Sequence, residues 1–246
     1  MTGNLKSDGL SSEVICLSGD GRDVHVKLKH NIRAKRYILR VPVDGDLPVL
    51  TVPKGGTVKT AQQFAQRQYM WLLQKLERTA ERIPFDENAL IPLRGLAHTI
   101  RYSGNLRGLS RSFIDEGEKA VISISGAPES IQRKTLEFLK KQASADLQVA
   151  VLKHCASLQL SYKSISLKDT KSRWGSCSSD GRLSFSWRLI LAPPFVLDYV
   201  AAHEVAHLVK MDHSPEFWHV CEKLAPQTPE AKQWLRQNGA KLHLYG

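Results

Sequence analysis

Two histidines and one glutamate stand at a spacing that can bind and use a metal ion. His203 and His207 are four residues apart within the stretch YVAAHEVAHLVKMDHSPEFW, residues 199–218. On a helix this spacing puts both imidazoles on one face, where they can hold a single ion. Glu204 projects about 100° further around the helix. That direction is poor for a ligand but well suited to taking a proton from a water bound to the metal.

A third histidine extends this pair into a ligand set of the catalytic type. Alone, the pattern H-E-x-x-H fits two hydrogen-bonded core histidines equally well, but His213 follows just beyond the pair. Three nitrogen ligands and one open position are typical of catalytic zinc sites, whereas structural sites use four protein ligands. We therefore predict one zinc ion bound by His203, His207 and His213. Glu204 is the predicted general base.

One position departs from a known variant of this pattern. Metzincins place their third histidine at the same offset as His213, after a glycine that turns the chain. Lys210 occupies the position of that glycine here. The metzincin signature is therefore incomplete, and the turn that brings the third histidine back must be made in another way.

A buried helix is expected to carry the first two histidines. Pro193 and Pro194 suit its start, because proline fits the first helical turn and resists a helix arriving from upstream. Apolar residues surround the ligand face, as expected at the centre of a domain. They are Phe195, Val196, Tyr199, Val200, Leu208 and Val209. We expect this helix to end near Asp212, and Ser214 to cap a second helix, so that His213 lies at the elbow between them.

The rest of the C-terminal half is expected to pack a long helix and a small antiparallel sheet around the metal-binding helix. A helical pattern over residues 129–158 precedes three short strands. The strands are expected at residues 163–167, 173–178 and 182–187, with a hairpin turn at Ser-Asp-Gly, residues 179–181. Zinc peptidases of this layout hold an extended substrate along a sheet edge. The strand with Gly175 is our candidate edge, since glycine marks the close approach of another backbone or a bulge.

Five other residues of this half are assigned weaker roles. His154 fits a hydrogen-bonded core position on the inner edge of the long helix and is left out of the metal set. Cys177 has no evident activating base, which favours a structural thiol over a nucleophile. No partner for the oxyanion is identified. Arg173, Arg188 and Tyr199 are weak candidates for it, because each also fits a surface or packing role.

The N-terminal half is expected to be rich in β-structure. Apolar residues alternate with basic ones in a period of two from residue 24. Short strands are expected at residues 24–28, 37–41, 48–52, 91–102, 112–114 and 120–125. One long helix, capped by Thr57, is expected over residues 57–82. We therefore expect an α+β protein with three regions. These are a flexible N-terminus (residues 1–23), a β-rich region (24–127) and a catalytic domain (128–246).

Composition limits the compartment and the partners. The chain has 246 residues and a formal net charge of +11, which favours attraction to nucleic acid, an anionic surface or acidic substrate segments. A solvated sheet face explains the basic N-terminal strands better than a dedicated nucleic-acid surface, and non-specific nucleic-acid association is the second option. Four scattered cysteines, no apolar leader and no run of ~20 apolar residues predict a soluble cytoplasmic protein without membrane association.

Two segments together resemble the YgjP-like family of predicted zinc metallopeptidases, which is related to the WLM and SprT-like groups. They read RWGSCSSDGRLSFSWRLILAPP, residues 173–194, and HEVAHLVKMDHSPEFW, residues 203–218. The resemblance covers most of the chain from residue 24. It implies a zincin-like core with the three histidines as ligands and Glu204 as general base. SprT-like relatives cleave proteins bound to DNA, but this chain shows no separate DNA-reading module, so that role does not transfer automatically.

The residues and the resemblance together predict zinc-dependent hydrolysis of a protein or peptide substrate. Two other functions fit parts of the sequence. A zinc-stabilised nucleic-acid-binding protein without catalysis would explain the charge but has no need of Glu204. A metal-dependent hydrolase of another amide would use the same residues. Cleavage of unfolded protein compared with cleavage of small amides, each with and without a chelator, separates these functions.

Overall fold

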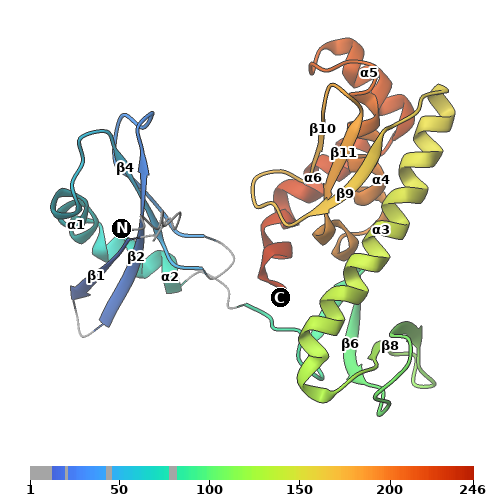
Figure 1. The fold of residues 1–246 in the computed structure, drawn as a ribbon, viewed down its shortest axis with the longest axis horizontal. Coiled ribbons are helices and arrows are strands. Elements are labelled where there is room, and N and C mark those ends of the chain that lie inside the picture. Colours follow the sequence, from blue (N-terminus) through green and yellow to red (C-terminus); the bar gives the residue numbers. More distant parts are fainter. Residues whose placement is uncertain (1–12, 20–21, 43–45, 78–81) are drawn as a thin grey trace, which may run out of the picture. The chain divides into compact units, whose positions relative to one another are not determined.

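The computed structural model describes residues 13–19, 22–42, 46–77 and 82–246 (Figure 1). The chain divides into two compact units, Met1–Glu81 and Arg82–Gly246, and each unit has its own hydrophobic core. The expected boundary after residue 127 falls inside the second unit. The reason is that strands preceding this point share a core with the helix that follows it, as Ile100 and Leu139 illustrate.

The first unit is a four-stranded sheet with two helices packed on it. Its elements are β1 (Val14–Gly19), β2 (Arg22–Asn31), β3 (Ile38–Arg40), β4 (Val49–Pro53), α1 (Val58–Arg67) and α2 (Tyr69–Glu77). The strand order is β1-β2-β4-β3, with β2 and β4 parallel and the other pairs antiparallel. Alternate residues of β2, such as Val26, enter the core together with Ala65 and Leu72 of the helices.

Two expectations for the first unit need correction. Part of the supposedly flexible N-terminus forms β1, because its alternate side chains are buried in the core. The expected single helix is two helices with an interruption at Gln68, whose backbone leaves the helical conformation (ψ 9°). The Thr57 cap is confirmed, since its hydroxyl accepts a hydrogen bond from the backbone N–H of Thr60. Residues 1–12 and 78–81, on which the same expectations also fall, lie outside the described residues.

The second unit joins two sheets through one long helix. Its strands are β5 (Leu90–Leu93), β6 (Leu96–Tyr102), β7 (Arg111–Ile114), β8 (Ala120–Ile124), β9 (Ser164–Lys168), β10 (Gly175–Cys177) and β11 (Arg182–Ser186). Its α-helices are α3 (Ile131–Leu158), α4 (Pro194–Ala206), α5 (Pro215–Leu224) and α6 (Thr228–Asn238). Three 3₁₀ helices complete it: η1 (Pro128–Ser130), η2 (Trp187–Leu191) and η3 (Gly239–Leu244). Figure 1 shows α3 running from the sheet with β6 and β8 to the sheet with β9, β10 and β11.

The α+β class is therefore confirmed. Both sheets of the second unit contribute to one core around α3, with Ile122 from one sheet and Phe185 from the other. Within the described part of the chain, no helix is both long enough and apolar enough to cross a membrane.

The small sheet beside α4 is mixed, and the expectation of a purely antiparallel sheet is wrong. Its order is β10-β11-β9, in which β10 and β11 are antiparallel and β11 and β9 are parallel. The expected hairpin turn is present, with Gly181 at φ 77° donating its N–H to the carbonyl of Ser178. The chain reverses once before β10 and again at this hairpin, so β9 and β11 must run in the same direction.

Helix α4 starts as expected at Pro194 but ends before Asp212, earlier than predicted. Its last residue is Ala206, and His207 is its C-cap. The N–H of Val209 then bonds to the carbonyl of Ala206, three residues back, which tightens the chain into a 3₁₀-type turn. Half of Val209 is exposed, so the apolar pattern of the sequence continues past the real end of the helix.

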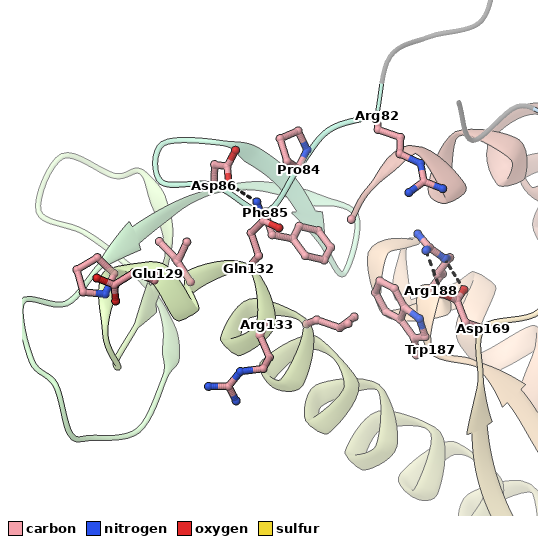
Figure 2. Close-up of a pocket in the computed structure, with 14 residues that line it drawn as sticks. Arg82, Pro84, Phe85, Asp86, Glu129, Gln132, Arg133, Asp169, Trp187 and Arg188 are labelled. Carbon is pink, nitrogen blue, oxygen red and sulfur yellow. Dashed lines mark hydrogen bonds and ion pairs between the residues drawn. The ribbon is translucent and has the colours of Figure 1, made fainter. Parts of the chain in front are cut away.

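The C-terminal segment closes onto the second unit through a buried arginine. Arg188 donates to both carboxylate oxygens of Asp169, at 2.7 and 3.1 Å, and to the carbonyls of Leu242 and Tyr245. Figure 2 shows the Arg188–Asp169 pair beside a cavity of about 890 Å³, with the ring of Trp187 next to it. The lining of this cavity includes none of the candidate metal ligands.

Candidate metal centre

The structure brings the three predicted histidines together. One ring nitrogen each from His203, His207 and His213 lies within 4.8 Å of the other two. Nε2 of His203 and Nε2 of His213 are 3.2 Å apart. Nitrogens that share a tetrahedral zinc at bond lengths near 2.1 Å are about 3.4 Å from each other. The donor set and its spacing therefore fit one shared ion.

Each histidine is placed by a different local structure. His203 lies in the last turn of α4, His207 is the C-cap, and His213 lies in the connection to α5. Nδ1 of His207 lies 3.1 Å from the carbonyl oxygen of Lys210. Because a carbonyl oxygen only accepts, Nδ1 carries the proton and Nε2 keeps its lone pair. In the same connection, the carboxylate of Asp212 accepts a hydrogen bond from the backbone N–H of Ser214, the N-cap of α5.

Aromatic rings from the first turn of α5 pack against the imidazoles. The ring of Phe217 stacks on His207 with 4.4 Å between centroids and meets His203 edge-on at 4.9 Å. The Trp218 ring lies 5.7 Å from His203 and 5.9 Å from His213. Neither Phe217 nor Trp218 was predicted from the sequence to contact the metal ligands. Their position directly after the elbow was the signal that could have linked them to the site.

Burial favours the neutral form of two of the imidazoles, His203 and His207. Burial, reinforced by the two neighbouring histidines, lowers the pKa of His203 to about 4. Burial also lowers the pKa of His207. A neutral imidazole offers the lone pair that a metal ion needs. Nδ1 of His203 is buried without a hydrogen-bond partner among the described residues, so aromatic packing and the contact of Nε2 with His213 orient this ring.

Glu204 packs against the backbone of β10. The side chain is almost fully buried. A Cβ atom added to Gly175 would lie 2.4 Å from Oε1 of Glu204 and 2.7 Å from its Cγ. Glycine at this position therefore leaves the space that the glutamate fills. Instead of the expected second backbone or bulge, a side chain approaches Gly175, and the pairing of Gly175 with Phe185 is regular.

The burial of Glu204 changes its acidity. Removal from water raises the pKa of this carboxyl to about 7, against a lowering effect of the positive charge of Arg173. A carboxyl group with such a pKa can take up and release a proton near neutral pH. Arg173, a weak candidate for an oxyanion partner, thus acts electrostatically on Glu204 in this structure.

The other candidates of the sequence analysis have structural surroundings. Nε2 of the buried His154 lies 2.9 Å from a carboxylate oxygen of Asp198, which confirms a hydrogen-bonded core histidine. Burial, followed by the negative charge of Glu204, raises the pKa of the Cys177 thiol to about 11, so the thiol is protonated at neutral pH. Arg188 is engaged by Asp169 and the C-terminal carbonyls. Tyr199 is buried, with its ring edge-on to His203.

The strand β10 presents a free backbone edge beside Glu204. It pairs only with β11 within the described sheet. Trp174 and Ser178 direct their backbone hydrogen bonds to β11. In an antiparallel pair these directions alternate from residue to residue. The backbone N–H and C=O groups of Gly175 and Cys177 therefore point away from β11, toward the open side.

Comparison with known proteins places the chain in a family. A family model described as "YgjP-like, metallopeptidase domain" matches residues 35–238. No curated protein matches the sequence. A crystal structure of the metallopeptidase zymogen of Pyrococcus abyssi abylysin is similar at 18% identity and a TM-score of 0.34, with 37% of this chain and 93% of that chain covered. This likeness is too low to inform the fold. By the family match, the chain belongs to the YgjP-like metallopeptidases and is a metal-dependent hydrolase.

Proposed function

We propose that this chain is a zinc-dependent peptidase with a zincin-like core, in which His203, His207 and His213 bind one zinc ion. The observation that carries the proposal is the convergence of three imidazole nitrogens within 4.8 Å. Burial lowers the pKa of two of these rings, His203 and His207, which favours their neutral form. A three-histidine set with an open position suits catalytic zinc. Membership of a metallopeptidase family supports both the metal and a protein or peptide substrate.

Glu204 is the general base in this proposal. The three histidines would hold a zinc ion, whose Lewis acidity would polarise a peptide carbonyl and make water easier to deprotonate. A carboxylate oxygen of Glu204 accepts the proton of the attacking water and passes it to the amide nitrogen that leaves. The water oxygen bonds to the carbonyl carbon, the C–N bond breaks, and an acid and an amine result. The buried seat against Gly175 supports this role, because it raises the pKa to about 7.

The free edge of β10 is the proposed substrate-binding strand. The outward N–H and C=O groups of Gly175 and Cys177 are free to pair with an extended peptide, which is the mode called strand addition. The same strand packs against Glu204. A peptide along this edge would therefore lie next to the proposed general base.

Metal analysis and peptidase assays on wild type and Glu204→Gln test the proposal. We expect one zinc per chain, hydrolysis of unfolded protein, loss of activity with a chelator and recovery with zinc. Glu204→Gln keeps the zinc and loses about 10²–10⁴-fold in hydrolysis. The control His213→Ala loses zinc as well as activity. Full activity of Glu204→Gln would refute the general-base role, and cleavage of small amides without proteolysis would redirect the function to another amide.

A further inference from the structure

A small cationic pocket lies on the sheet next to the free edge of β10. Its volume is about 360 Å³. Lys168 and Arg173 supply positive charge to its lining, and Ser176 and Ser184 supply hydroxyl groups. The hydroxyl of Thr170, which also lines the pocket, already donates to the carbonyl of Arg173. No carboxylate belongs to the lining residues. The donor groups of this pocket are therefore of the kind that receives an anion.

The strand register explains why these hydroxyl groups gather. Ser176 of β10 pairs with Ser184 of β11, which pairs with Ser166 of β9. Side chains of cross-strand partners point to the same face of a sheet, and neighbours along a strand point to opposite faces. A side chain at Gly175 would point at Glu204. The serines therefore lie on the other face of β10, so a single strand separates the pocket from the proposed general base.

Neither cation of the pocket forms an ion pair with any residue that the structure describes, although the charge of Arg173 acts on Glu204 through the strand. Both Lys168 and Arg173 are exposed. Their neighbours in the sheet differ, because Lys163 and Arg182 both pair with Asp180, at 3.4 and 2.7 Å. Within the described part of the chain, no ion pair neutralises the positive charge of the pocket, whereas Asp180 neutralises one of the two positive charges beside the hairpin.

We infer that this pocket binds an acidic side chain, aspartate or glutamate, of a peptide that lies along β10. The inference rests on the proposed peptidase function and gives it a substrate class: segments with an acidic residue close to the cleaved bond. Side chains of a peptide added to β10 alternate between the two faces of the sheet. An acidic residue in the right register therefore reaches Lys168 and Arg173, while its neighbours face the side of Glu204.

Peptide binding to the Glu204→Gln variant tests this inference without requiring hydrolysis. Short fluorescent peptides differ at one position, which carries Glu, Gln or Lys and is moved along the peptide. Anisotropy gives each Kd. At one register we expect Glu to bind roughly threefold to tenfold more tightly than Gln, and Lys to bind more weakly. Adding Lys168→Glu reverses this order. Arg182→Gln removes a cation from the same sheet outside the pocket and is the matched control, with the order unchanged.

The outcomes separate the pocket from the peptidase proposal. Equal Kd values for Glu and Gln peptides at every position, absence of binding, or a preference that survives Lys168→Glu would each overturn the acidic pocket, whatever the hydrolytic activity. A preference for Glu that Lys168→Glu abolishes, in a wild-type protein that cleaves nothing, would keep the pocket and remove the peptidase function. In an active enzyme the same preference appears in kcat/KM and weakens with added salt, because exposed charges are screened.

Discussion

Glu204 occupies a space that exists only because residue 175 has no side chain. Its carboxylate forms no hydrogen bond with another side chain in the described part of the protein, so packing sets its position. Close contact with the strand excludes water from it and raises its pKa to about 7. At the scale of residues, the proposed base is thus held by the shape of the backbone beside it.

Gly175→Ala should displace this carboxylate and impair hydrolysis. The new Cβ would lie 2.4 Å from Oε1 of Glu204, so the glutamate must move. Misplacement of a catalytic group by about 1 Å costs up to about a hundredfold in rate, and we expect kcat/KM to fall by about tenfold to a hundredfold. Zinc content should stay at one ion per chain.

The matched control is Gly117→Ala, where the nearest atom to the new Cβ is 3.5 Å away, an ordinary contact. Steady-state peptidase kinetics and metal analysis compare kcat/KM and zinc content between the two variants. Wild-type kcat/KM in Gly175→Ala would show that the seat of Glu204 does not depend on the glycine.

At the scale of elements, Asp198 fastens the beginning of α4 to its neighbours. Its carboxylate oxygens lie 2.9 Å from Nε2 of His154 on α3 and 2.8 Å from the side-chain amide of Gln227, just before α6. Burial on its own would raise the pKa of Asp198, but these hydrogen bonds and the positive charge of Lys153 outweigh it and hold the pKa below its usual value. One side chain therefore connects the helix of the proposed site to two others.

Asp198→Asn should destabilise the protein most at neutral pH. We expect a loss of about 1–3 kcal/mol in the free energy of unfolding at pH 7, typical of hydrogen bonds to a charged group. Because the pKa is lower in the folded state, the carboxylate stabilises the fold above its unfolded pKa of about 3.9. That contribution disappears as the pH falls through the lower folded value.

Urea unfolding at a series of pH values measures this difference. The wild-type and Asp198→Asn curves should converge in acid. Glu116→Gln, which changes an exposed carboxylate in a turn, serves as control and should match the wild type throughout. A gap between wild type and Asp198→Asn that stays constant down to low pH would contradict the assigned cause.

At the scale of the whole molecule, the chain consists of two units with separate cores. The core of the first unit is built from β1, β2, β4 and the two helices that follow. The core of the second contains residues from both of its sheets and from α3, α4 and α5. All three histidines and Glu204 belong to the second unit, residues 82–246. The family match begins at residue 35 and so includes most of the first unit as well.

Residues 82–246 should fold and bind zinc without the first unit, because their core needs no side chain from it. We expect the fragment to unfold cooperatively and to hold one zinc ion. Calorimetry and metal analysis test this, with the same fragment carrying His213→Ala as a metal-free control. A fragment that is unfolded, or folded without zinc, would show that the first unit contributes to the core or to the site.

The sequence by itself determined the local part of this protein. The spacing of His203 and His207 implies a shared helix face, and the proline signals predicted the starts of α4 and α5. The alternating pattern predicted most strands, and the turn residues predicted the hairpin of β10 and β11. These signals act over a few residues, because helix and strand periods and turn conformations depend on neighbours along the chain.

Only the tertiary structure decided which elements meet. The contact of Gly175 with Glu204, the parallel pairing of β9 with β11 and the meeting of Lys168 with Ser184 in one pocket join distant segments. The sheet of β5 to β8 also shares a core with α3, a later segment of the chain. For this reason the second unit begins at residue 82 and not after the expected residue 127. A periodic pattern reveals that a face is buried but not what covers it, since many apolar partners satisfy the same face. Long-range packing of complementary shapes makes that choice.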